Sequence, residues 1–145
     1  MSMQPKRSPI PAVGVVCLRD HDVLLVRRGT PPMEDRWSIP GGRIEWGERA
    51  ADAALRELKE ETSCEAELLG LVDVVDAVFT RRGEHDAWGH YVLIDYAARW
   101  VSGEGAPSEE LGRVIWADEQ EAGALPLTQG LAELLTRARG ILAST

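Results

Sequence analysis

The sequence has few cysteines, no excess of basic residues and no long hydrophobic run, and each absence excludes a class of protein. Only Cys17 and Cys64 occur in 145 residues. Two cysteines are too few for a disulfide framework, and neither belongs to the CxxC pair that is typical of a zinc site. We therefore expect both to be buried as small apolar side chains in a protein of the reducing cytoplasm.

Basic residues are outnumbered, because 16 Lys and Arg stand against 24 Asp and Glu, for a net charge of −8. Binding of nucleic acid through its phosphates needs a clustered basic surface, so we expect no nucleic-acid partner. The apolar run at residues 13–18 is far shorter than the roughly 20 residues that span a bilayer. No signal-peptide pattern opens the chain, so we expect a cytoplasmic protein without a membrane partner.

What the sequence does contain indicates a folded domain. Its hydrophobic fraction is 44%, and a chain of this length can bury roughly 70% of its unfolded surface. The polar, proline-containing residues 1–8 are predicted to form a flexible N-terminal arm. Residues 9–145 are predicted to form a single domain.

Hydrophobic patterning predicts a sheet with helices. Extended segments are expected at residues 10–19, 23–26, 37–39, 65–79, 88–100 and 113–116. Helices are expected at residues 49–62 and after Thr128, which resembles an N-cap. The core is predicted to include Val72, Val74, Val78, Leu131, Leu134, Leu135 and Ala138. The order of strands, helix, strands and helix indicates a mixed α/β sheet covered by helices.

Three carboxylates gather at the end of the first predicted helix. Glu57, Glu60 and Glu61 are spaced so that they crowd one side of its last turns, where the helix dipole already presents negative potential. Arg56 can offset part of the repulsion, but a divalent cation would offset more, since Mg²⁺ and Mn²⁺ prefer clustered oxygen ligands. The preceding Pro40-Gly41-Gly42 segment is predicted to be a tight turn with accessible backbone groups.

Together, the glycine segment and the helix resemble the Nudix box, which reads Gly, five residues, Glu, seven residues, and then Arg-Glu-aliphatic-any-Glu-Glu-any-Gly-aliphatic. The matching positions are Gly42, Glu48, Arg56, Glu57, Leu58, Glu60 and Glu61. Two positions depart from the pattern: Ser63 replaces a glycine and Cys64 replaces an aliphatic residue. Neither departure removes a carboxylate, although a left-handed helix exit at Ser63 would cost about 1 kcal/mol.

The resemblance implies an α/β/α sandwich with a mixed sheet, and an enzyme that hydrolyses the pyrophosphate bond of a nucleoside diphosphate linked to another moiety. It also implies Mg²⁺ as cofactor, with Mn²⁺ as a substitute. Carried over by position, the metal ligands would be Glu57, Glu60, Glu61 and the carbonyl of Gly41. Glu60 would be either a ligand or the base that activates water. Arg56 would hold a catalytic carboxylate in place, with Gly42 and Glu48 in support.

Residues outside the box have two interpretations each. Arg27 and Arg28 are candidates for contact with substrate phosphate, or they are a solvated strand end. Trp37 either stacks on a nucleotide base or packs in the core. Glu110 is a candidate for a further catalytic or metal-binding carboxylate, although an ordinary acidic loop would look the same.

The sequence does not decide which branch of the family, and therefore which substrate, applies. ADP-ribose or another nucleotide sugar, cleaved to release a nucleoside monophosphate, is the preferred substrate. A MutT-like enzyme acting on (d)NTPs or oxidised nucleotides is the alternative within the class. A Nudix module that binds a nucleotide sugar without cleaving it is the alternative from another class, but such modules typically lose box carboxylates that this chain keeps. Family members often form dimers, so pairing of two copies is also implied.

Overall fold

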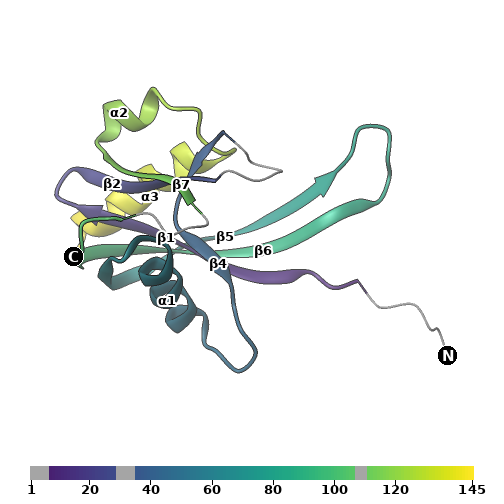
Figure 1. Cartoon of the computed structure of the whole chain (residues 1–145), viewed down its shortest axis with the longest axis horizontal. Helices are drawn as coiled ribbons and strands as arrows, with labels where there is room; N and C mark the ends of the chain where they lie inside the picture. Colours follow the sequence, from purple (N-terminus) through teal and green to yellow (C-terminus); the bar gives the residue numbers. More distant parts are fainter. Residues whose placement is uncertain (1–6, 29–34, 107–110) are drawn as a thin grey trace.

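A computed structural model describes residues 7–28, 35–106 and 111–145, with side chains for all of these except residues 28 and 111 (Figure 1). The first six residues of the predicted arm lie outside the described residues. Within the described part of the chain, no helix is long and apolar enough to cross a membrane.

Seven strands of the described chain form one sheet in the order β3-β2-β1-β6-β5, with β4 paired to β1 and β7 paired to β2. The pairing of β1 with β6 is parallel and the other pairings are antiparallel, so the sheet is mixed as predicted. The strands are β1 (Ile10–Arg19), β2 (Asp22–Arg28), β3 (Trp37–Ser38), β4 (Gly41–Arg43), β5 (Glu65–Thr80), β6 (Ala87–Ser102) and β7 (Leu111–Ala117).

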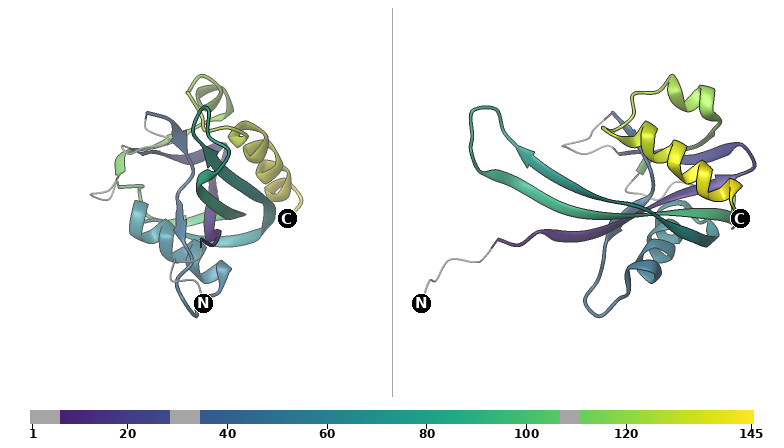
Figure 2. Two further views of the ribbon diagram at one scale, coloured as in Figure 1. Left: turned by 90° about the vertical axis from the view of Figure 1, so that its right-hand side faces the viewer. Right: turned by 180° about the vertical axis from the view of Figure 1, so that it is seen from behind.

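Helices cover both faces of this sheet. Figure 2 shows α1 (Ala50–Thr62) on one face, and α2 (Glu119–Gly123) with α3 (Leu131–Ala143) on the other. Side chains alternate along β1, so Val15 and Cys17 pack toward α1 while Val16 and Leu18 pack toward α3. The result is an α/β/α sandwich with two cores, and the predicted fold class is confirmed.

Most of the predicted core residues are buried. The α3 stripe of Leu131, Leu134, Leu135 and Ala138 is no more than 7% exposed. Cys17 and Cys64 are also buried and form no disulfide. Burial raises the pKa of the Cys17 thiol to about 12, which keeps it protonated and unreactive.

The assignment of Val74 and Val78 to the core is wrong, since each is 51% exposed, whereas Val72 is buried. The reason is visible in Figure 1, where the far end of the β5–β6 hairpin projects beyond the helices. A register shift between Leu71 and Asp73 also interrupts the alternation. Val72 packs in the α3-side core, but after the shift Asp73 and Val75 line the space beside α3, so Val74 lies on the other face. Near the tip, Phe79 stacks on Trp88 with 5.3 Å between their ring centroids.

The start of the last helix also differs from prediction. Gly130, with φ of 80°, is the N-cap of α3, and Thr128 lies two residues earlier. The backbone N–H of Thr128 donates to the Trp37 carbonyl at 2.9 Å, which ties this segment to β3. The short helix α2 was not predicted, although the capping box formed by Asp118 and Glu121 is a sequence signal for it.

Candidate active site

Gly41 and Gly42 belong to strand β4, where a tight turn was predicted. Gly41 and Gly42 pair with Gly14 and Val13 of β1. Their small size is required by close approaches from two directions. A Cβ on Gly41 would lie 2.1 Å from the Val13 carbonyl oxygen, and one on Gly42 would lie 2.5 to 2.6 Å from the carboxylate of Glu57. The glycines therefore let α1 and β1 press against β4 from both sides.

Two of the predicted metal ligands lie directly against this strand. Glu61 is only 6% exposed, and its Oε1 accepts a hydrogen bond from the Gly41 backbone N–H at 3.0 Å. Glu57 places its carboxylate over Gly42 with its side chain 15% exposed. Because both residues come from the last turns of α1, the helix and β4 together fix the two carboxylates.

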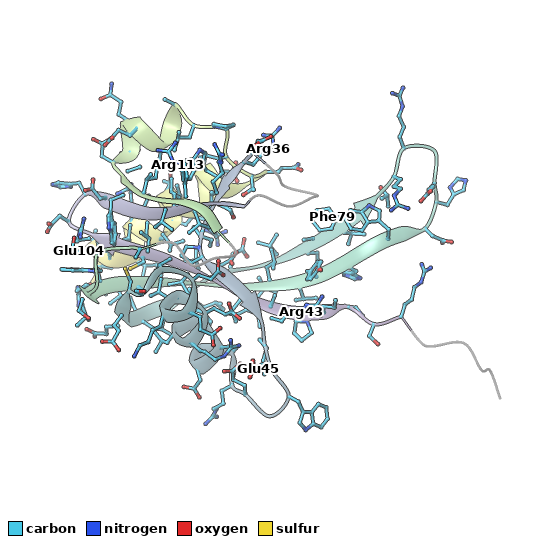
Figure 3. The ribbon with its side chains drawn as sticks, viewed as in Figure 1. Arg36, Arg43, Glu45, Phe79, Glu104 and Arg113 are labelled. Atoms are coloured by element: carbon cyan, nitrogen blue, oxygen red, sulfur yellow. The ribbon has the colours of Figure 1, made fainter. Side chains whose placement is uncertain are left out.

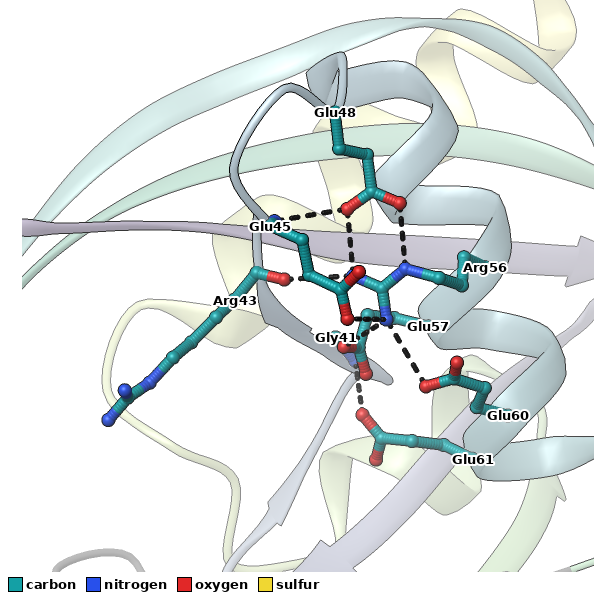
Figure 4. Close-up of polar contacts among 8 residues, drawn as sticks. All are labelled: Gly41, Arg43, Glu45, Glu48, Arg56, Glu57, Glu60 and Glu61. Carbon is teal, nitrogen blue, oxygen red and sulfur yellow. Dashed lines mark hydrogen bonds and ion pairs between the residues drawn. The ribbon is translucent and has the colours of Figure 1, made fainter.

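Arg56 is the centre of the hydrogen-bond network drawn in Figure 4. Its Nε and Nη2 donate to the two oxygens of Glu48 at 2.7 and 2.8 Å. Its Nη1 donates to Glu57 Oε1 at 2.9 Å and to Glu60 Oε2 at 3.2 Å. Its Nη2 also donates to the Arg43 carbonyl at 3.0 Å. One planar guanidinium thus joins the loop before α1 to two carboxylates near the end of the helix.

Charge pairing in this network shifts the ionisation of its members. The hydrogen bonds from Arg56, helped by one from the Glu45 backbone, lower the pKa of Glu48 to about 2. The hydrogen bond to Glu48 is in turn the main cause that raises the pKa of Arg56 above its ordinary value. Both groups are therefore charged throughout the neutral range. Glu45 lies at the edge of the network, with its Oε1 3.8 Å from Arg56.

Helix α1 ends as the box requires despite the missing glycine. Ser63 adopts the left-handed conformation at φ of 62° and donates its backbone N–H to the Lys59 carbonyl. Cys64 is buried in the core on the α1 side of the sheet. The two departures from the box therefore leave the exit of the helix in the expected conformation.

The donor set suits a hard divalent cation. The site offers oxygen ligands of the kind that Mg²⁺ and Mn²⁺ prefer. Arg56 uses only one oxygen each of Glu57 and Glu60, and no other hydrogen bond from a described residue reaches those two carboxylates. Among the described residues, no three Asp, Glu, His or Cys side chains already stand together as a group that could hold a metal.

Of the predicted residues outside the box, Trp37 and Arg27 are those whose side chains the structure describes. Trp37 is buried in the α3-side core at 5% exposure, with the Arg113 guanidinium 5.8 Å from its ring centroid. Figure 3 shows Arg36 and Arg113 in the half of the molecule opposite α1, whereas Arg43 and Glu45 lie beside α1. Arg27 is half-buried in β2. The side chain of Arg28 and all of Glu110 lie outside the described residues.

Replacing Arg56 by Lys is expected to weaken both the fold and the activity. A lysine ammonium cannot reproduce the bidentate contact with Glu48 while also reaching Glu57. Losing these charged hydrogen bonds should lower the free energy of unfolding by about 2 kcal/mol. Urea denaturation and turnover measurements check this, with Arg99→Lys as control, because Arg99 is 44% exposed and pairs with Glu67 away from the site. Equal effects of the two substitutions would contradict the central role of Arg56.

The sequence analysis missed Asp95, a carboxyl that the sheet buries. It lies in β6 directly after the apolar run Val92-Leu93-Ile94, and it is 5% exposed. Burial, with a smaller contribution from the nearby charge of Asp73, raises its pKa from 3.8 to about 6. A lone aspartate in an otherwise apolar strand was the available signal.

Asp95 should make stability depend on pH in a defined direction. Because its pKa is higher in the folded state, the folded protein binds more protons between pH 4 and 6, and this contribution to stability is lost as pH rises through that window. Above pH 6 the loss amounts to about 3 kcal/mol. Asp95→Asn should therefore be more stable than wild type at pH 7.5, and the gain should shrink at pH 4. Urea denaturation at both values checks this, and a gain that does not vary with pH would contradict it.

Comparison with known proteins agrees with the fold and the box. A family model described as the NUDIX domain matches residues 8–138. The crystal structure of a MutT NUDIX hydrolase from Burkholderia pseudomallei superposes with a TM-score of 0.78 and 28% identity, covering 90% of this chain and 98% of that one.

Curated relatives carry names from two substrate branches. An ADP-ribose pyrophosphatase of Methanocaldococcus jannaschii is 30% identical over 96 residues, which is 66% of this chain and 54% of the relative. A putative 8-oxo-dGTP diphosphatase of Bacillus subtilis is 40% identical over 60 residues, 41% of this chain and 38% of the relative. The matched segment thus spans about half the length of the first relative and less of the second.

Proposed function

Because the chain belongs to the Nudix hydrolase family, we propose that it hydrolyses the pyrophosphate bond of a nucleoside diphosphate linked to another moiety, with ADP-ribose or another nucleotide sugar as the preferred substrate. One observation carries the proposal. Arg56 and the glycines of β4 hold the carboxylates of Glu57 and Glu61 in fixed positions against the backbone. A helix end that served only stability would not concentrate negative charge in this way.

Mg²⁺, or Mn²⁺ in its place, is the cofactor that these groups fit. Glu57, Glu60, Glu61 and the Gly41 carbonyl would hold it, and when bound it would neutralise the pyrophosphate oxygens and favour attack by water. Glu60, whose side chain is 60% exposed, would act either as such a ligand or as the base that takes a proton from a water molecule. Arg56 keeps Glu57 and Glu60 oriented for these tasks.

Other residues would act on the substrate or on the site around it. Arg27 and Arg28 are proposed to contact a substrate phosphate, and Glu110 to add a further carboxylate. Gly42 and Glu48 support the site by giving Glu57 room and by anchoring Arg56. Since Trp37 is buried in the α3-side core, its role is better explained as packing than as base stacking.

A substrate panel tests the proposal. The purified protein is assayed with Mg²⁺ against ADP-ribose, other nucleotide sugars, dinucleoside polyphosphates and oxidised dGTP. Release of nucleoside monophosphate from a nucleotide sugar is expected, and chelation of the metal with EDTA should abolish it. Re-addition of Mg²⁺ or Mn²⁺ should restore the activity.

Hydrolysis of oxidised dGTP alone would instead favour the MutT-like alternative, which the B. subtilis relative's name supports. Specific binding of ADP-ribose without turnover of any substrate would overturn the enzymatic proposal in favour of a binding module. Pairing of two copies stays a prediction, and sedimentation of the purified protein would test it.

A further inference from the structure

A cavity of about 270 Å³ lies between the sheet and α3, away from the box carboxylates. Its lining comes from four parts of the chain, and includes Ser38, Ile39, Asp73, Asp95, Thr128 and Arg137. Apolar walls with a few polar groups are typical of a pocket that receives a small molecule or part of one.

Asp95 is the unusual member of this lining. It is 5% exposed, and its carboxyl accepts no hydrogen bond from any described residue. Gly14 makes room for it, because a Cβ on Gly14 would lie 2.3 Å from Asp95 Oδ1 and 2.8 Å from the Ile39 side chain. Burying a carboxyl without a partner costs free energy. A ligand that donates hydrogen bonds to Asp95 would remove this cost.

The other charged groups of the cavity leave Asp95 without a cation. Asp73 faces Asp95 across the β5–β6 pairing, and its Oδ2 accepts a hydrogen bond from Arg137 at 2.9 Å. Glu133 adds a further carboxylate to the lining. The cavity is therefore unsuited to a phosphate, and it suits an uncharged group that carries N–H or O–H donors.

Backbone pairing connects this cavity to the box. Asp95 is the register partner of Gly14, and Gly14 is the register partner of Gly41, whose N–H is bonded to Glu61. Asp95 and Gly41 are thus two strand spacings apart, about 10 Å. A substrate with its pyrophosphate at the box could therefore place an uncharged end in the cavity.

We propose that Asp95 determines substrate specificity by accepting a pair of hydrogen bonds from an uncharged, donor-rich end of the substrate. Two groups have this chemistry: the N–H edge of a guanine-type base and the vicinal hydroxyls of a ribose. Both present two adjacent donors that match the two oxygens of a carboxylate. This inference rests on the proposed function, because it assumes that a nucleotide-linked substrate reaches the box.

Paired substrates, of which one member lacks hydrogen-bond donors of the group in question, provide the test. A guanosine diphosphate sugar is compared with its inosine counterpart, which lacks the 2-amino group. ADP-ribose is compared with an analogue lacking the hydroxyls of its terminal ribose. In wild type, the member with both donors of the relevant pair should be preferred by about 100-fold in kcat/KM.

Asp95→Asn should remove that preference, because the amide replaces one acceptor by a donor at nearly constant volume. Turnover of the donor-lacking member should fall less than that of its partner, because it donates fewer hydrogen bonds to Asp95 in wild type. Asp76→Asn, on the exposed face of β5, is the matched control and should keep the preference. If Asp95→Asn does not fold, Asp95→Ala serves the same comparison. The pair whose preference disappears identifies the base edge or the sugar hydroxyls as the recognised group.

Calorimetry with the same four compounds separates this inference from the proposed function. If wild type hydrolyses none of them, the proposed function fails. The role of Asp95 is then still decided by binding, by comparing the preference between the two members of each pair in wild type with that in Asp95→Asn. Loss of the wild-type preference on Asn substitution, in turnover or in binding, supports the inference. An unchanged preference, equal weakening of all four compounds, or no preference in wild type overturns it.

Discussion

Glu57→Gln is expected to reduce turnover by a factor on the order of 10³, with little change in the free energy of unfolding. Gln has nearly the same shape as Glu, and its amide oxygen can still accept the hydrogen bond that Arg56 Nη1 donates to Glu57 at 2.9 Å. The substitution removes the negative charge, which is the property that a divalent cation and its bound substrate require. The loss should therefore appear in kcat and in metal affinity, while the fold persists.

Glu65→Gln is the matched control for this experiment. Glu65 has a side chain 57% exposed, and it pairs with Lys59 at the surface, so the same chemical change occurs outside the proposed site. Turnover with saturating Mg²⁺, calorimetric titration with Mg²⁺ and urea denaturation are measured on both variants. Wild-type-like turnover in Glu57→Gln would remove the basis for assigning catalysis to the box carboxylates.

Local pattern was sufficient to predict the parts of the fold that depend on neighbours in sequence. Helix α1 forms where alanines and leucines repeat, and it begins and ends within a residue of the prediction. Residues 12–18 of β1 are all buried, because successive side chains of a strand between two helical layers enter the two cores in turn. The box itself predicted that Arg56, Glu57 and Glu48 belong together, and they are in direct contact.

Features that depend on distant parts of the chain could not be predicted from sequence pattern. Nothing in residues 74–78 shows that the hairpin extends beyond the helices. An alternating strand pattern therefore predicts buried side chains there. Gly41 and Gly42 read as a turn because glycine has the same local signature in a turn and at a close contact between strands. Asp95 is buried by Gly14 and α3, which belong to distant parts of the chain. Its candidate role therefore cannot be recognised from its neighbours in sequence.

The two glycines of β4 should respond to alanine in opposite ways. In Gly41→Ala the new Cβ would meet backbone atoms, with the Val13 carbonyl oxygen at 2.1 Å and the Gly14 Cα at 3.0 Å. Backbone in a paired strand cannot move aside locally, so we expect the free energy of unfolding to fall by about 3 kcal/mol or more. In Gly42→Ala the Cβ would meet only the carboxylate of Glu57. That group is the end of a flexible side chain, so it can swing away at little cost in stability.

Displacing the Glu57 carboxylate should nevertheless cost about 10²-fold in turnover, because a catalytic group shifted by about 1 Å loses its alignment. Gly42→Ala is thus expected to be a folded protein with low activity, and Gly41→Ala an unstable one. Gly70→Ala is the control, because the new Cβ would lie 3.9 Å from the Ile141 side chain, which is an ordinary van der Waals contact. Urea denaturation and turnover of the three variants check the contrast. If Gly42→Ala kept full activity, the contact between β4 and Glu57 would be irrelevant to catalysis, and β4 would serve only to join α1 to the sheet.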